Sequence, residues 1–159
     1  MPIAQTIQRY LAQHQVPFEL VAHRHTGSSL DSASEAHIQP DRLAKAVLLA
    51  DDLERRHFIM AVVPASHRVE LDRLSQQAGR RMHLATEKDA AGLFVDCEAG
   101  AIPPIGPAYG VETILDDSLM EQPELYFEAG DHQHLVRLKT PNLVKLLAPC
   151  AHGQFSHPA

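Results

Sequence analysis

One stretch of the sequence decides the fold: Leu43-Ala44-Lys45-Ala46-Val47-Leu48-Leu49-Ala50. Polar residues bound it on both sides, with Pro40-Asp41-Arg42 before it and Asp51-Asp52 after it. A short apolar run between turn residues is typical of a buried strand. Residues 57–63 form a second apolar run that Pro64 stops, and the polar residues 51–56 join the two. The pattern therefore predicts a hairpin of two central strands.

Lys45 is the one charged residue of the first run. A buried ammonium is costly to desolvate, so core strands seldom keep one without a partner or a task. At the mouth of a strand, a lysine can hold an anionic ligand or polarise a carbonyl. Alternatively, its stem packs on the core while the ammonium reaches water. Taken alone, this residue leaves both interpretations open.

The composition indicates one globular domain. The chain has 159 residues, of which 45% are apolar, as in folded proteins rather than disordered ones. No apolar stretch reaches the roughly 20 residues that span a membrane, and Met1–Gln5 lacks the pattern of a secretory signal. Cys97 and Cys150 form no disulfide framework or metal motif. We therefore expect a cytoplasmic protein with no membrane partner.

Hairpins alternate irregularly with helices along the chain, which favours an α+β fold with a mixed or largely antiparallel sheet. Apolar spacing and turn residues predict the elements. Helices are expected at 3–14, 31–37, 71–78, from 86 toward 94 and from 141, and further strands at 18–21, 82–85, 111–115, 125–129 and 134–138. We predict a single domain over 1–159 with its core at about 15–148. Residues 149–159, rich in His, Pro, Gly and Ser, are predicted to be a flexible tail.

The net charge of −6, from 20 acids and 14 bases, argues against a general nucleic-acid binder and against DNA as a partner. A local basic patch that grips only the end of a nucleic acid stays compatible with this balance. Its candidates are Arg55-Arg56, Arg68, Arg73 and Arg80-Arg81. Each of them is equally compatible with a solvated surface charge.

Eleven histidines are present, and two pairs are spaced for one face of a strand, His23-x-His25 and His132-x-His134. Such a pair can be half of a zinc site, so a histidine-based metalloenzyme is one hypothesis. No Cys, Glu or Asp at helical spacing completes the set. We therefore predict no metal and no cofactor.

The familiar catalytic motifs are missing from the sequence: there is no G-x-S-x-G elbow, P-loop, dinucleotide fingerprint or H-E-x-x-H. Cys97 lies between Asp96 and Glu98, whose charges raise the pKa of a thiol, so we interpret it as structural. The segment Gly100–Pro107 is more suggestive. Its glycines permit unusual backbone angles and its prolines stiffen it, so it can present bare backbone groups to a ligand. A tight connector would have the same composition.

Several of these features follow one another in a defined order: Lys45 in its apolar strand, Val63–Leu71, Gly100-x-x-x-Pro104-x-Gly106, and Glu128-Ala129-Gly130 before a strand. In this order and spacing, over about residues 15–148, the chain resembles the YbaK/prolyl-tRNA-synthetase-associated family. The resemblance implies an α+β fold with a mixed, largely antiparallel, barrel-like sheet flanked by helices. It also implies an aminoacyl-tRNA deacylase that edits mischarged tRNA in trans and so serves translation fidelity.

The resemblance also assigns residues. Lys45 matches the essential lysine of the family, and Gly100 and Pro104 match its G-x-x-x-P loop, so these three are the expected catalytic set. The expected substrate-binding residues are Ile102, Pro103, Gly106, Gly130, His132 and Thr26, with Ser28 nearby. The family often has a small polar residue after the lysine, whereas this chain has Ala46.

No nucleophile–base triad is present, so we expect no acyl-enzyme. Lys45 is expected to hold the terminal phosphate or the ester carbonyl and to stabilise developing negative charge, while the Gly100–Pro104 backbone positions the aminoacyl group and a water. A small pocket would act as a second sieve. The expected substrates are tRNA(Pro) carrying alanine or a similar small residue, then cysteine, then serine or threonine.

The acidic balance predicts only transient, salt-sensitive contact with the acceptor end of the tRNA, and a synthetase could supply further contacts. A rival hypothesis is a non-catalytic module that binds aminoacyl-tRNA or an amino-acid-like ligand with the same lysine and loop.

Overall fold

The computed structural model describes residues 3–54 and 56–159. Three residues lie outside the described part: Met1, Pro2 and Arg55. The first two belong to the predicted domain and to the N-terminal segment that was compared with a secretory signal. Arg55 belongs to the predicted hairpin turn and to the predicted basic patch. Helices are α1 (Gln5–His14), α2 (Ser29–Glu35), α3 (Leu71–Ala78), α4 (Glu87–Leu93) and α5 (Thr140–Leu147), with 3-10 turns η1 (Pro40–Arg42), η2 (Gly106–Tyr109) and η3 (Asp117–Glu121). Strands are β1 (Glu19–Ala22), β2 (Ala44–Asp51), β3 (Phe58–Pro64), β4 (His67–Val69), β5 (Met82–Leu84), β6 (Glu112–Asp116), β7 (Glu124–Glu128), β8 (His134–Lys139), β9 (Ala151–Gly153) and β10 (Ser156–Pro158). Within the described part of the chain, no helix has the length and apolar character needed to cross a membrane.

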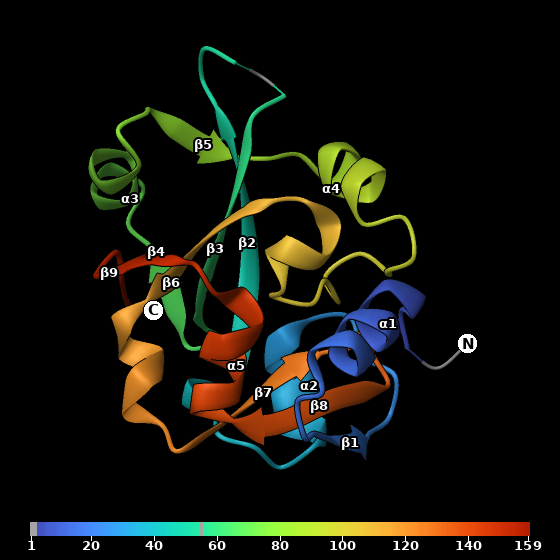
Figure 1. The fold of residues 1–159 in the computed structure, drawn as a ribbon. Helices are drawn as coiled ribbons and strands as arrows, with labels where there is room; N and C mark the ends of the chain where they lie inside the picture. The colour runs from blue at the N-terminus through green and yellow to red at the C-terminus, as the bar shows by residue number, and fades with distance from the viewer. Residues whose placement is uncertain (1–2, 55) are drawn as a thin grey trace.

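The central sheet has the strand order β5-β2-β3-β6-β9 (Figure 1). The predicted hairpin is confirmed, because β2 and β3 pair antiparallel with Lys45 opposite Val63. β3 pairs parallel with β6, and β6 pairs parallel with β9. The sheet is therefore mixed, as an irregular alternation of hairpins and helices predicts.

A second, antiparallel sheet has the order β1-β8-β7, and β4 pairs with β10 in a third. The α+β class is thus confirmed, but the expectation of one barrel-like sheet is wrong for the described residues. β3 ends at Pro64, which has no N–H to continue a ladder. The central and second sheets are joined by a single bridge between Leu43 and Tyr126, so they do not close into a barrel.

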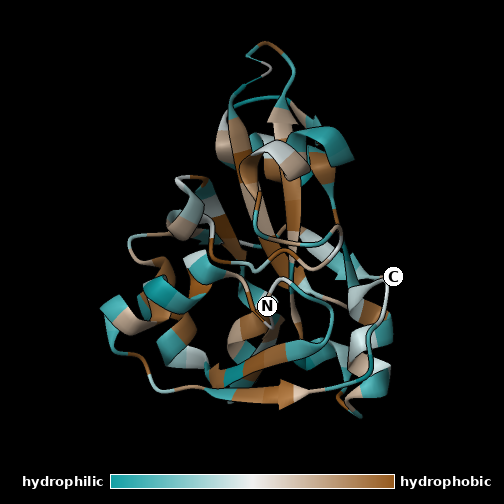
Figure 2. Cartoon of the chain, turned by 90° about the vertical axis from the view of Figure 1, so that its right-hand side faces the viewer, coloured by the Kyte–Doolittle hydropathy of each residue, from teal (hydrophilic) through white to brown (hydrophobic). Residues whose placement is uncertain are grey.

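The two faces of β2 pack against different parts of the molecule, because side chains alternate along a strand. Ala46 and Leu48 pack on a core that includes α1, α5 and Ile105. Val47 and Leu49 pack on the other side, with α3 and Phe155. Figure 2 shows the strands largely brown where these layers meet, while the outer helices carry much of the teal.

The predicted ends of two helices are confirmed, and a third helix begins earlier than predicted. Thr86 and Asp89 form the predicted capping box at the start of α4, and α3 ends at Gly79 in the left-handed conformation. α2 begins earlier than predicted, because Ser28 rather than Asp31 is the N-cap: the Ser28 side chain accepts from the backbone N–H of Asp31. This shift brings Ser32 into the body of the helix.

The prediction of a flexible tail over 149–159 is wrong for most of its length, because β9 and β10 are paired strands. Phe155, between them, is fully buried. Its N–H donates to Asp116 Oδ1 at 3.0 Å and its carbonyl accepts from the N–H of Glu70 at 2.6 Å. One apolar anchor is enough to fix a segment that is polar in composition.

We expect Phe155→Leu to lower the free energy of unfolding by about 1–2 kcal/mol, since it leaves part of a buried ring site unfilled. Phe18→Leu makes the same change at a residue that is 39% exposed, and it should cost within about 0.5 kcal/mol. Urea denaturation of both variants checks this. Equal stability losses would show that the C-terminal segment is not anchored.

Candidate functional site

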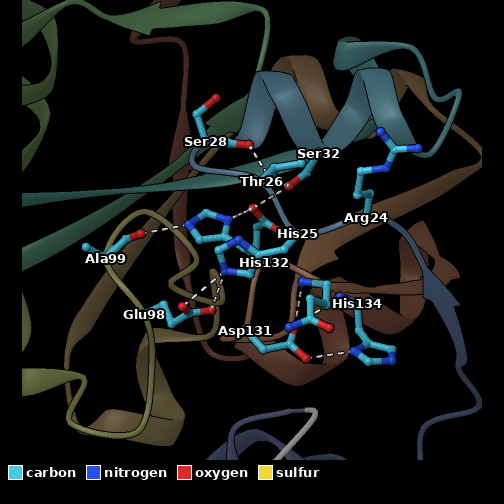
Figure 3. A network of polar contacts seen from close by, with 12 residues as sticks. Arg24, His25, Thr26, Ser28, Ser32, Glu98, Ala99, Asp131, His132 and His134 are labelled. Atoms are coloured by element: carbon cyan, nitrogen blue, oxygen red, sulfur yellow. Dashed lines mark hydrogen bonds and ion pairs between the residues drawn. The ribbon is translucent and has the colours of Figure 1, made fainter.

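Four of the predicted site residues lie together where the loop before α2, the loop before η2 and the β7–β8 turn meet (Figure 3). The N–H of Thr26 donates to the His132 carbonyl at 3.2 Å. A Cβ built on Gly100 would lie 3.2 Å from His132 Nε2. The carbonyl of Gly130 accepts from the N–H of Glu98 at 2.8 Å. The fold therefore joins Thr26, Gly100, Gly130 and His132, which lie far apart in the sequence.

His132 is held by both of its ring nitrogens. Nε2 lies 2.7 Å from the carbonyl oxygen of Ala99, and since a carbonyl can only accept, the proton is assigned to Nε2. Nδ1 lies 3.0 Å from Glu128 Oε2. His132 is buried and has φ +56°, a left-handed conformation that is uncommon for a residue other than glycine. In this arrangement the ring holds the loop at Ala99 and has no nitrogen free for a substrate.

Glu128 is the acid behind this histidine and is only 2% exposed. Its Oε2 accepts from Ser32 Oγ at 3.0 Å, and Ser32 Oγ lies 2.7 Å from Thr26 Oγ1. Burial raises the pKa of Glu128 to about 7, although the charge of His132 and the hydrogen bond from Ser32 act in the opposite direction. Glu128 Oε1 has no hydrogen-bond partner among the described residues. With a pKa of about 7, the Glu128 carboxyl is therefore close to its ionisation point at neutral pH, and its Oε2 faces Nδ1 of His132.

The raised pKa of Glu128 makes a prediction about stability. A carboxyl whose folded pKa lies at about 7, above its ordinary 4.5, stabilises the fold fully at acid pH and loses that contribution as the pH rises through 7. From pH 5 to pH 8, the wild-type protein should lose about 1–3 kcal/mol of unfolding free energy relative to Glu128→Gln, which cannot ionise. Urea denaturation of both proteins at each pH gives the comparison. The same pH dependence in both would contradict it.

A small cavity of about 100 Å³ borders this cluster. Gly100 and Ile102 line it, as do Ala90 of α4 and Phe94, the residue that directly follows this helix. Pockets for drug-sized ligands have roughly 300–1,000 Å³, so this space suits only a small group. Cys97 also lines it, but burial raises the pKa of its thiol to about 12. A thiol with that pKa stays protonated and is a poor nucleophile.

The rest of the Gly100–Pro107 loop forms a buried frame. Pro103 and Pro104 are buried, as is Gly106, where an added Cβ would overlap the side chain of Thr113. None of these three lines the cavity. A wider hollow of about 400 Å³ beside β1 and β8 contains none of the predicted residues.

Lys45 makes its described hydrogen bond outside the cluster. It is half-buried, and its Nζ donates to the carbonyl of His67 at 3.2 Å. Burial, and then the charge of Arg68, lower the pKa of Lys45. Strand alternation puts its side chain on the face of β2 opposite the one that contacts the core around Ile105. No hydrogen bond within residues 3–54 and 56–159 joins Lys45 to Gly100 or His132.

The start of β2 lies near α2, the helix whose Ser32 contacts Glu128. Leu43 packs in one apolar cluster with Ala33 of α2, and the next residue back along this helix is Ser32. Lys45 follows Leu43 by two residues, so it lies on the same side of the strand. The start of β2 therefore contacts both α2 and β7, the strand that ends at Glu128.

The four histidines of the zinc hypothesis make other contacts. His25 Nε2 lies 3.2 Å from Glu98 Oε1, and its ring is 5.9 Å from that of His132. His23 Nδ1 contacts the carbonyl of Arg24, and His134 Nδ1 lies 2.7 Å from Asp131 Oδ2. In the part of the chain that the structure describes, no three residues among His, Cys, Asp and Glu are placed to bind one metal ion.

Sequence reasoning missed Ser32 and the role of Glu128. Glu128 carried a signal, since it is a charged residue that directly follows the apolar residues 125–127, and Lys45 likewise stands beside apolar neighbours. Ser32 carried none, because a serine in a short polar helix is ordinarily solvated.

Comparison with known proteins agrees with this architecture. A family model described as an aminoacyl-tRNA editing domain matches residues 23–146. The crystal structure of the hypothetical protein APE2540 is similar, with a TM-score of 0.84 and 16% identity over 96% of this chain and 100% of that one. So is that of a protein described as a candidate trans-editing enzyme for prolyl-tRNA synthetase, with a TM-score of 0.82 and 18% identity over 99% of this chain and 98% of the other. At these identities the structural matches show the fold alone. The family model spans well over half of the sequence, and this chain belongs to the aminoacyl-tRNA editing domain family.

Proposed function

We propose that this protein is a trans-editing aminoacyl-tRNA deacylase, which hydrolyses the ester between a wrong amino acid and the 3′ end of a tRNA. The observation that carries the proposal is that the backbone of Gly100 borders a cavity of about 100 Å³ in a domain of the editing family. Its φ of +79° is a conformation that favours glycine. A cytoplasmic location, where tRNA is charged, is part of the proposal.

The size of the cavity supports a small aminoacyl group. Ile102 and Phe94 narrow it, so alanine or a similar residue fits more readily than a larger one. The fold shared with a candidate trans-editing enzyme for prolyl-tRNA synthetase supports tRNA(Pro) as the carrier. The leading substrate is therefore alanyl-tRNA(Pro), and cysteinyl-tRNA(Pro) is next. Such a pocket acts as a second sieve that excludes what the synthetase charges correctly.

The chemistry we propose is direct attack of water on the ester carbonyl. The water oxygen bonds to the acyl carbon, the bond from that carbon to the ribose oxygen breaks, and the ribose oxygen takes up a proton. The products are a free amino acid and an uncharged tRNA. An acyl-enzyme is not required, in keeping with the inert thiol of Cys97. The Gly100 N–H donates no hydrogen bond among the described residues and is available to the developing oxyanion.

Lys45 is assigned to the acceptor-end phosphate rather than to the ester carbonyl. Its side chain lies on the face of β2 opposite the one that packs on Ile105, and its described hydrogen bond goes to the His67 carbonyl rather than to the loop. We therefore assign the aminoacyl group of the terminal nucleotide to the cavity and its phosphate to Lys45. The nearby Arg68 adds positive charge on the same side, which favours a phosphate.

The net charge of −6 fits a protein that contacts the tRNA only near its acceptor end. Each phosphate contact releases counterions, so we expect contact that is weak, transient and salt-sensitive. A synthetase bound to the same tRNA is the proposed source of further contacts.

A panel of mischarged tRNAs tests the function. We expect release of alanine from alanyl-tRNA(Pro), slower release of cysteine, and no release of proline from prolyl-tRNA(Pro). A thin-layer or filter assay of labelled amino acid measures each rate against the spontaneous one. No turnover above the spontaneous rate on any member would contradict the proposal and favour a binding module.

A further inference from the structure

We infer that Glu128 and Ser32 are positioning residues of the editing site, which act through His132 to hold the Ala99–Gly100 peptide in the orientation that deacylation needs. The inference rests on the proposed function. Neither residue lines the cavity, so each acts through another group rather than on the substrate.

A continuous chain of polar contacts carries the inference. It runs from Thr26 Oγ1 to Ser32 Oγ over 2.7 Å, and from Ser32 Oγ to Glu128 Oε2 over 3.0 Å. It continues to His132 Nδ1 over 3.0 Å and ends with Nε2 at the Ala99 carbonyl over 2.7 Å. Three segments remote in sequence are tied together at one histidine, and Figure 3 shows the Thr26–Ser32 and His132–Ala99 contacts.

The contact between His132 Nε2 and the Ala99 carbonyl fixes the orientation of the Ala99–Gly100 peptide. The bond between Ala99 and Gly100 is trans, so the Ala99 carbonyl and the Gly100 N–H point in opposite directions from one plane. Because the carbonyl is bound to His132, the Gly100 N–H is aimed away from that ring. The position of the imidazole thus sets the direction of the donor that we assign to the oxyanion.

Packing alone does not account for Glu128. Its side chain is 2% exposed, and one of its oxygens has no hydrogen-bond partner among the described residues. A buried carboxyl of this kind costs free energy, and an apolar residue of similar volume often serves stability better. The contact between Glu128 and Nδ1 fixes the tautomer of His132, as acidic partners of functional histidines commonly do.

The test compares four variants on the best substrate of the panel. Ser32→Ala and Glu128→Ala break the chain of contacts. Glu128→Gln should keep it, because the amide can donate to Nδ1 and leave the proton on Nε2. Thr140→Val is the matched control: it removes another buried hydroxyl, which donates to the Gln122 carbonyl beyond the far end of β8.

We expect Ser32→Ala and Glu128→Ala to lower kcat by about 10–100-fold with KM changed by no more than about two-fold, since they misdirect a donor without removing a substrate contact. Glu128→Gln should retain most of the wild-type kcat. Thr140→Val should lose comparable stability in urea and keep its kcat. Wild-type kcat in both alanine variants, or an equal loss in Thr140→Val, would overturn the inference.

A second readout does not depend on turnover. In ¹⁵N-labelled protein, the His132 Nε2–H should give a slowly exchanging resonance that is lost in Glu128→Ala and kept in Glu128→Gln. The Ala101 amide, which donates to Glu98 within the same loop, should exchange faster in Glu128→Ala. If the wild type hydrolyses no mischarged tRNA, the proposed function fails, whereas an unchanged Nε2–H resonance in Glu128→Ala overturns the positioning role itself.

Discussion

Lys45→Ala is expected to lower kcat/KM for deacylation by about 10²–10³-fold, the size of effect that loss of one preorganised charge or donor produces. The ammonium is half-buried and makes one described hydrogen bond, to the His67 carbonyl, so it keeps donors for a phosphate. Steady-state kinetics on the best mischarged tRNA measure the loss. Circular dichroism and urea denaturation should show an intact fold.

Two further variants separate charge from packing. Lys45→Met keeps the apolar stem that lies on the sheet and removes only the charge, so it should be as inactive as Lys45→Ala. Lys145→Ala removes an exposed lysine from α5 and should leave kcat/KM unchanged. Full activity in Lys45→Ala would rule out the mechanism proposed for this residue.

Gly100→Ala should lower kcat by about 100-fold or more, because a small displacement of a positioned group can cost that much. The new Cβ would lie 3.2 Å from His132 Nε2 and 3.3 Å from the Gly27 carbonyl oxygen. Those contacts are tighter than ordinary, so the ring or the loop must shift. The left-handed backbone at φ +79° adds strain of about 1–2 kcal/mol.

Gly110→Ala is the control that isolates the contact from the strain. Gly110 has φ +70°, but an added Cβ there meets nothing within 4 Å. Gly110→Ala should therefore lose about 1–2 kcal/mol in urea from the strain alone, and Gly100→Ala should lose more because of its tight contacts. Only Gly100→Ala should lose deacylation, and equal activity of the two variants would show that the Gly100 backbone has no role in the reaction.

The sequence predicts the parts of this fold that local patterns specify. Two apolar runs around a polar turn give the β2–β3 hairpin, and Thr86 with Asp89 gives the start of α4. The order of Lys45, the Gly100 loop and the Gly130 turn also predicts the family correctly. The hairpin and the helix start depend on neighbours along the chain, and the family is indicated by the order and spacing of its motifs, so the sequence alone contains this information.

Non-local contacts explain what could not be predicted. Phe155 orders the C-terminal residues through Asp116 and Glu70, which are remote in the sequence. Ser32 joins the site only because α2 packs beside the β7–β8 turn. The position of Lys45 on the far face of β2 from the loop likewise depends on how the sheets meet, which strand patterns do not determine.

The pairing of β10 with β4 has a practical consequence for handling this protein. Pro158 lies opposite His67, whose carbonyl holds Lys45, and His157 lies opposite Arg68. The N–H of Ala159 also donates to the Ser66 carbonyl at 2.9 Å. A substitution that breaks the pairing of β10 with β4 would therefore also disturb the backbone that holds Lys45. Variants for the assays above are therefore better designed with this strand left unmodified.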